Sequence, residues 1–260
     1  MNANARINWL GTYTLYKKEV RRFLKVYNQT LFAPVITSLL FLAVFTLAIS
    51  SKKNHHIGNI PFQEFMAAGL IIMSVVQNAF ANTSSSFTMG KVLGNIIDYL
   101  MPPLAPGEII TAMVFGGVTR GLAVGMLVGI SVYIFVPIHI HSIGYSLFHI
   151  VAASMLLALI GVLSGIFAET FDQMSAITSY IITPLSFLSG TFYSVKSLPG
   201  FWHTVSQYNP FFYMIDGFRY GMTGYHDGSL TVGLTTLSIT IVVLWTFAHT
   251  LIKRGYRIKT

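Results

Sequence analysis

Six long apolar stretches run through this 260-residue sequence and limit what it can fold into. A helix of about 20 apolar residues is long enough to cross the hydrocarbon core of a bilayer, which is roughly 30 Å thick. The stretches are Leu31–Ser50, Phe62–Phe87, Ala112–Val136, Ser146–Ala168, Met174–Ser194 and Leu230–Ile252. Only 9% of the residues are charged, against about 25% in soluble domains. The sequence therefore predicts an all-α integral membrane protein of one domain, 1–260, with six transmembrane helices.

Basic residues gather at the ends of the chain, with six before residue 26 and four after residue 252. If both termini are cytoplasmic, Lys91 brings the basic residues on that side to eleven. Four fall on the outside, namely Lys52, Lys53, Lys196 and Arg219. The positive-inside rule favours this orientation. Because the positive charge follows the ends of the spans, the net charge of +8 does not indicate a nucleic-acid partner.

Two segments outside the spans are predicted to form amphipathic helices. In the N-terminal segment, 1–30, aromatic and aliphatic residues recur at steps of three and four. They are Trp9, Tyr13, Tyr16, Val20, Phe23, Leu24 and Tyr27. Lysine and arginine take the other face, which indicates a helix along the cytoplasmic membrane surface; packing against a protein partner is the alternative.

The second segment is "MGKVLGNIIDYLMPPLAPGEII", residues 89–110. It predicts a short cytoplasmic helix with one apolar side that ends at Pro102, since proline cannot continue the helical hydrogen-bond ladder. That side suits docking of another protein or of the bilayer surface.

No catalytic, metal or cofactor site is predicted. Gly90 and Lys91 faintly resemble a phosphate loop, but Val92 stands where magnesium would need a hydroxyl, so the chain itself is not expected to bind ATP. His139 and His141 have no third metal ligand nearby. An intramembrane serine hydrolase, with Ser164 or Ser189 as nucleophile, stays as an alternative with no clearly placed base. A stand-alone ion-coupled carrier is the other alternative, although the acidic residues lie at span ends or in loops.

Uncharged polar residues lie within two of the spans. Gln77, Asn78 and Asn82 occur in the second span, and Thr183 and Ser186 in the fifth. Polar groups at membrane depth face a protein interior or a water-filled path, because lipid cannot hydrogen-bond them. Both a transport path and bonding between helices remain open. Glycines at every fourth position of the third span, from Gly117 to Gly129, predict close helix packing.

Three charged residues within apolar surroundings are predicted to be structural. Arg120 lies inside the third span, where a charge is costly, so it should face protein, with Glu169 and Asp172 as the first candidate partners. Asp216 and Arg219 fall three residues apart on a helix expected to begin at Asn209, which caps it. An ion pair between them, or one shared with a neighbouring helix, would reduce the cost of burying both charges.

The order of these features resembles the permease subunit of type-2 ABC exporters. The most specific part is "TPLSFLSGTFYSVKSLPGFWHTVSQYNPFFYMIDGFRYGMTG", residues 183–224, in which "GTFY", "NP" and "D.FRYG" follow the family's order. The resemblance covers nearly the whole chain. It divides the chain into an N-terminal interfacial segment (1–30), five spans (31–194), an external re-entrant segment with two short helices (195–229), and a last span with a basic C-terminus (230–260).

The resemblance also implies a function and partners. Two permease chains, expected as a homodimer, would work with two ATPase subunits that bind ATP and magnesium in a bacterial inner membrane. Lys91, Asn95, Asp98 and Tyr99 lie where the family's coupling helix meets the ATPase, and the second and fifth spans line the family's export path. The substrate class stays open among drugs, lipids and polysaccharides.

Overall fold

The computed structural model describes residues 7–50, 56–96 and 101–257. These residues form a helical bundle with one small β-hairpin, β1 (His56–Ile57) and β2 (Ile60–Pro61), in antiparallel register. Five of the described helices are long and apolar enough to cross a membrane. They are α2 (Ala33–Ser50), which continues the π-helical turn η1 (Asn28–Phe32), and α3 (Phe62–Val92), α5 (Pro106–Tyr133), α6 (Ile143–Phe167) and α11 (Leu230–Arg254). The all-α membrane fold is thereby confirmed.

The predicted continuous span at Met174–Ser194 is not confirmed. The chain there forms three consecutive pieces, namely α7 (Phe171–Ile177), a π-helical stretch η2 (Thr178–Ile182) and α8 (Thr183–Leu188). Pro184 lacks the N–H that a regular helix would use, and the wider π turns directly before it accommodate that interruption. The helix then ends before Gly190, whose φ of 82° belongs to the left-handed region.

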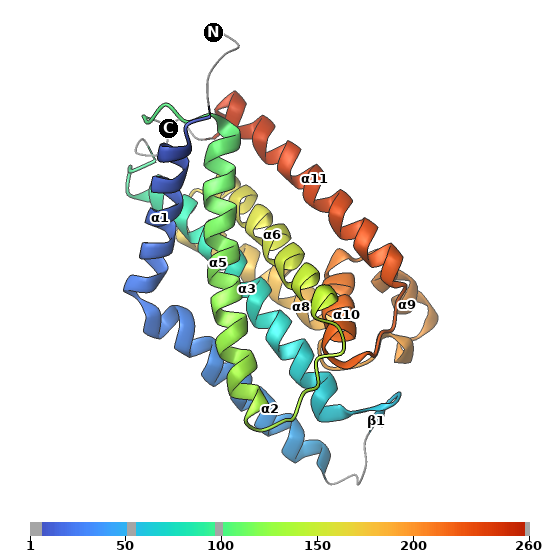
Figure 1. Cartoon of the computed structure of the whole chain (residues 1–260). Coiled ribbons are helices and arrows are strands. Elements are labelled where there is room, and N and C mark those ends of the chain that lie inside the picture. Colours follow the sequence, from blue (N-terminus) through green and yellow to red (C-terminus); the bar gives the residue numbers. More distant parts are fainter. Residues whose placement is uncertain (1–6, 51–55, 97–100, 258–260) are drawn as a thin grey trace.

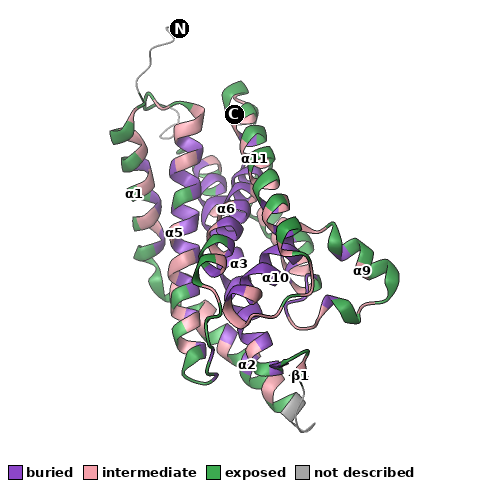
Figure 2. Ribbon diagram, turned by 45° about the vertical axis from the view of Figure 1, so that its right-hand side comes forward, coloured by how far each residue is buried: buried purple, intermediate pink, exposed green. Residues whose placement is uncertain are grey.

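Helices α3 and α6 form the centre of the bundle, and α2 and α11 lie at its edge (Figures 1 and 2). In α3 and α6, 78% and 72% of the most apolar stretch is buried, whereas the figure is 11% for the spans of α2 and α11. The edge helices therefore expose apolar residues nearly all round, as a chain surrounded by lipid or by a second subunit does.

Glycines let the helices α3, α5 and α6 approach one another closely, as predicted. A Cβ on Gly117 of α5 would lie 2.9 Å from the Cβ of Ala158 in α6. A Cβ on Gly161 of α6 would overlap the Thr83 hydroxyl and lie 2.6 Å from the Phe80 carbonyl oxygen of α3. Small residues at such contacts are the usual way that membrane helices pack without a hydrophobic driving force between them.

The N-terminal helix α1 (Trp9–Lys25) packs along α5 (Figure 1). Its buried residues are Leu15, Glu19 and Phe23. The residues of the predicted apolar face therefore lie partly on the buried side of the helix and partly on its exposed side. Phe23 points to the bundle, whereas Trp9 and Tyr13 are exposed. The start of α1 is fixed to the start of α5, because the Asn8 backbone N–H donates to Glu108 Oε1 at 2.6 Å.

Two helices precede α11, namely α9 (Gly200–Gln207) and α10 (Pro210–Thr223). The predicted start of α10 is confirmed, because Asn209 caps it by accepting from the Phe211 backbone N–H at 3.0 Å. The helix ends at Gly224, whose φ of 76° is left-handed. Most of α10 is buried against α3, α6 and α11.

Candidate functional site

Asp216 ties α10 to the loop before α11. Its side chain is 2% exposed, and its two carboxylate oxygens accept the backbone N–H groups of Asp227 (2.7 Å) and Gly228 (2.9 Å). Hydrogen bonds to a charged acceptor are stronger than those between neutral groups. The carboxylate therefore fixes the course of the chain where it turns from α10 into the last long helix.

Arg219 ties the same helix to a different segment. Its guanidinium, 1% exposed, donates from Nη2 to the carbonyl oxygens of Gly190 (2.7 Å) and Thr191 (3.4 Å), in the turn after α8. It also stacks on Phe65 of α3, with 3.6 Å between Cζ and the ring centroid. Such a contact of a cation with an aromatic face is favourable when both are withdrawn from water.

The predicted ion pair between Asp216 and Arg219 is wrong. Both residues lie in the described part of the chain, and their charged groups form no salt bridge there. The i,i+3 spacing does place them on one side of α10, but each side chain extends to a separate backbone segment. Backbone N–H groups bind the Asp216 carboxylate and backbone carbonyl groups bind Nη2 of Arg219 in place of a partner side chain, while Nε of Arg219 is buried without a hydrogen-bond partner among the described residues.

Asp227 completes what we call the α10 cluster, consisting of Asp216, Arg219 and Asp227. Its side chain, 1% exposed, accepts from Ser194 Oγ (2.8 Å), the Val195 N–H (2.9 Å) and Tyr225 Oη (2.7 Å). Burial raises the pKa of the Tyr225 phenol, which keeps it protonated as a donor. Sequence reasoning placed Asp227 in a loop and assigned it no role, and its position in the turn-forming stretch "YHDG" was the available signal.

A second cluster joins α1 to α3 and α5. Glu19 is fully buried and accepts from Ser86 Oγ of α3 at 2.7 Å and from Arg22 Nη2 at 3.1 Å. Arg22 in turn donates to Ser85 Oγ (3.1 Å) and Asn82 Oδ1 (3.2 Å). Sequence reasoning missed this cluster. The available signal was that Glu19 is the single acid in a strongly basic helix.

Arg120 belongs to the same region, and it faces protein as predicted. It is 9% exposed and donates from Nη2 to Asn78 Oδ1 of α3 at 2.8 Å. The expected partners Glu169 and Asp172 are wrong: among the described residues Arg120 forms no salt bridge, and Glu169 Oε1 lies 3.9 Å from Arg257 Nη1. We call Glu19, Arg22, Asn78, Asn82 and Arg120 the α1 cluster.

The predicted path residues lie in two different surroundings. Asn78 and Asn82 are buried in the α1 cluster, and Gln77 is half-buried. In α8, Ser186 is buried and donates to the Ile182 carbonyl of its own helix at 2.7 Å, and Thr183 is half-buried. The hydrogen bonds of Asn78 and Asn82 run to α5 and α1, so they do not bring these residues to Thr183 and Ser186.

Of the four predicted coupling residues, two are described. Lys91, in the last turn of α3, donates to the carbonyl oxygens at the end of α6, those of Gly165 (3.2 Å), Ile166 (2.8 Å) and Ala168 (2.7 Å). A cation at a helix C-terminus satisfies carbonyls that lack partners within the helix. Asn95 is exposed in the following turn, and Asp98 and Tyr99 lie outside the described residues.

The two serines considered as nucleophiles, Ser164 and Ser189, are not hydrogen-bonded to a base in the described part of the chain. Ser189 Oγ accepts from Asn209 Nδ2 at 2.9 Å, and donates to the Leu185 carbonyl. Ser164 lies in the buried face of α6. Among the described residues, no hydrogen bond joins either serine to a histidine, and such a bond is what a nucleophile and its base require.

Comparison with known proteins places this arrangement among transporters. The model of the ABC-2 type transporter family matches residues 11–223. The inner membrane transport permease YadH of Escherichia coli (strain K12) is 39% identical over 247 residues, which are 95% of this chain and 96% of that protein. Nodulation protein J of Rhizobium leguminosarum bv. viciae is 22% identical over 253 residues, 95% of each chain.

Proposed function

This chain belongs to the ABC-2 type transporter family and is the permease subunit of an ABC transporter, and on that premise we propose that two copies form an export path driven by two separate ATPase subunits. It is a multi-pass protein of the inner membrane. In this proposal ATP and magnesium are bound by the partner ATPase, and the chain itself catalyses nothing.

The exposed apolar surface of the edge helices supports the proposal that a second copy of this chain binds there. α2 and α11 keep only 11% of their apolar stretches buried within one chain. A groove of about 590 Å³ along α2 is lined mainly by aliphatic residues such as Leu39, Leu40 and Leu47, with Phe135 and Val136 of the chain beyond α5. Contact with a second permease would cover part of this surface and would supply the other half of the path.

We further propose that the chain crosses the membrane six times with both termini cytoplasmic. The described part of α1 begins at the end of the bundle where α11 ends (Figure 1), which supports this topology. The stretch from Phe171 to Leu188, the fifth span along the chain, raises the number of crossings from five to six and is completed by the turn at Gly190. In this orientation α9 and α10 form the external segment that re-enters the outer leaflet.

Reporter fusions provide the test of this topology. Fusions after residues 52 and 196 should report an external position, and fusions after residues 92, 170 and 260 a cytoplasmic one. The reason is that eleven basic residues lie on the proposed inner side and four on the outer. A cytoplasmic signal at residue 196 would rule out the crossing between Phe171 and Leu188.

Coupling to the ATPase is proposed for Lys91, Asn95, Asp98 and Tyr99. Lys91 joins the end of α3 to the end of α6, which supports a route from the segment after α3 to the central helices. For the path we propose Gln77, Asn78, Asn82, Thr183 and Ser186, with the substrate a lipid-like, drug-like or glycan molecule.

Reconstituted transport with and without the ATPase tests the function. The purified chain alone should hydrolyse no ATP, and the complex should export only with ATP. Asp98→Ala and Tyr99→Ala should leave insertion intact and uncouple hydrolysis from export, because they remove only the contact with the ATPase. Lys253→Gln, at the end of α11, serves as the matched control on the same side. Normal export by the Asp98 and Tyr99 variants would contradict the coupling assignment.

A further inference from the structure

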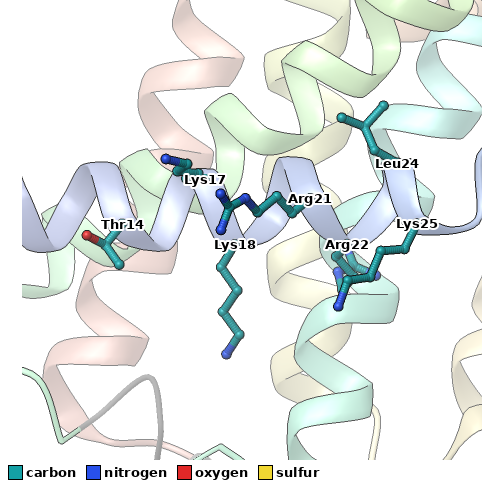
Figure 3. Close-up of a pocket in the computed structure, with 7 residues that line it drawn as sticks. All are labelled: Thr14, Lys17, Lys18, Arg21, Arg22, Leu24 and Lys25. Atoms are coloured by element: carbon teal, nitrogen blue, oxygen red, sulfur yellow. The ribbon is translucent and has the colours of Figure 1, made fainter.

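Helix α1 has three faces, and only one of them packs on the bundle. Leu15, Glu19 and Phe23 are buried. With 3.6 residues per turn, the next face carries the exposed aromatic residues Trp9 and Tyr13, and the exposed Leu24 lies at its border with the third face. The third face is basic and carries the exposed residues Lys17, Arg21 and Lys25, and Figure 3 shows them together with Lys18 along one side of the helix.

The basic face forms a groove of about 810 Å³ whose lining contains no acid. It is lined by Thr14, Lys17, Lys18, Arg21, Arg22, Leu24 and Lys25. Glu19, the one acid of α1, is directed to the bundle, where Ser86 and Arg22 donate to it. Within the part of the chain that the structure describes, Arg21 and Lys25 form no salt bridge, so their charge is not neutralised there.

The groove is fixed to the bundle at one edge. Arg22 lines it and also donates to Ser85 and Asn82 of α3, at 3.1 and 3.2 Å. Gly116 of α5 allows the close approach, because a Cβ at that position would lie 2.7 Å from Glu19 Cβ. The cations are therefore presented by a helix that is held in place, which lowers the entropic cost of binding an anion.

We propose that this groove binds the phosphate of anionic phospholipid headgroups. Tryptophan and tyrosine favour the boundary between hydrocarbon and headgroups, so the exposed face with Trp9 and Tyr13 places the adjoining Lys17, whose Nζ lies 5.9 Å from the centroid of the Tyr13 ring, at the level of the phosphates. Lysine and arginine next to such a face are attracted to anionic lipid. A soluble phosphate compound would not account for the exposed apolar face beside the groove.

The proposal rests on the proposed function only for the leaflet concerned, the cytoplasmic one. The test uses the full chain without any ATPase. A negative lipid result therefore does not affect the assignment as a transporter. Conversely, a failure of ATP-driven export would not affect the lipid result. The chain is purified from vesicles of phosphatidylglycerol and phosphatidylcholine in equal amounts. Mass spectrometry then measures the ratio of the two lipids that stay bound.

The variant is Lys17→Gln/Arg21→Gln/Lys25→Gln, and the matched control is Lys253→Gln/Arg254→Gln, which removes exposed basic residues at the end of α11. One basic residue near an anionic surface contributes roughly fivefold in affinity. We expect the triple variant to lower the preference for phosphatidylglycerol by about tenfold or more, and the control to leave it near the value of the unchanged chain. If the triple variant does not fold, as judged by its thermal melt, Arg21→Gln alone is measured, with an expected loss of about fivefold.

Three results would overturn the proposal. One is an unchanged lipid ratio in the folded groove variant, and another is an equal loss in the control, which would indicate general charge attraction. The third is displacement of the bound lipid by inorganic pyrophosphate at constant ionic strength, which would show that the groove takes soluble phosphate compounds.

Discussion

At the scale of single residues, Asp216 and Arg219 are the strongest test of how the external segment is held. Asp216→Ala removes the acceptor of two backbone N–H groups, and each buried N–H left unpaired costs about 1–3 kcal/mol. We expect a clearly lower melting temperature of the purified chain. Asp216→Asn should lose less, since an amide keeps one acceptor oxygen.

The charge swap Asp216→Arg/Arg219→Asp distinguishes this arrangement from a direct ion pair. It should not restore stability, because each side chain binds a separate backbone segment. Lys196→Met serves as the comparison, since Lys196 is 56% exposed and its Nζ lies 3.9 Å from Oδ1 of the buried Asp227, and we expect it to lower the melting temperature less than the loss of either buried charge on α10. Recovery of the melting temperature in the swap would show that the two charges pair directly.

The sequence allowed the roles of some residues to be predicted and not those of others. The helix start at Asn209 and Pro210 was predicted correctly. The capping side chain of Asn209 and the N–H group that it binds are only two residues apart, so the local sequence is sufficient to indicate the cap. The partners of Arg219 are 29 and 28 positions away in the chain. Spacing along α10 could therefore indicate that the charges needed partners, but it could not say which.

At the scale of elements, the contact between α3 and α6 is the most extensive in the bundle and depends on glycine. Gly161→Ala should destabilise the chain, because the new Cβ would meet the Phe80 carbonyl oxygen at 2.6 Å, and backbone cannot move aside cheaply. Overpacking of this kind costs about 1–3 kcal/mol. Gly129→Ala is the control, since its Cβ would lie 3.9 Å from Ile71, and a thermal melt compares the two. Equal melting temperatures would contradict the close contact.

Element boundaries were predictable only in part. The predicted starts at Phe62 and Leu230 are confirmed, since α3 and α11 begin there, whereas α3 continues to Val92, five residues beyond the predicted end at Phe87. The stretch after Phe171 was predicted as one long span, and Pro184 indicated an interruption of its hydrogen-bond ladder. The π turn before Thr183 could not be predicted, because apolar composition does not record it. In α1 the helix was predicted but its buried side was not, because Phe23 is buried beside Glu19 while Trp9 and Tyr13 of the predicted apolar face are exposed.

At the scale of the whole molecule, we propose that this chain forms half of a membrane path and hydrolyses nothing itself. The family match over residues 11–223 and the exposed edge helices α2 and α11 together favour it. The α10 cluster holds together the segments between α8 and α11, and Lys91 joins the ends of α3 and α6. A path that opens and closes in response to ATP requires connected elements of this kind.

The subunit composition of the intact assembly tests this central claim most directly. An affinity-tagged chain is purified from its own membranes in mild detergent, and the complex is weighed by native mass spectrometry. The account predicts two copies of this chain with two copies of a P-loop ATPase. A single copy that transports substrate in reconstituted vesicles without any ATPase would contradict it.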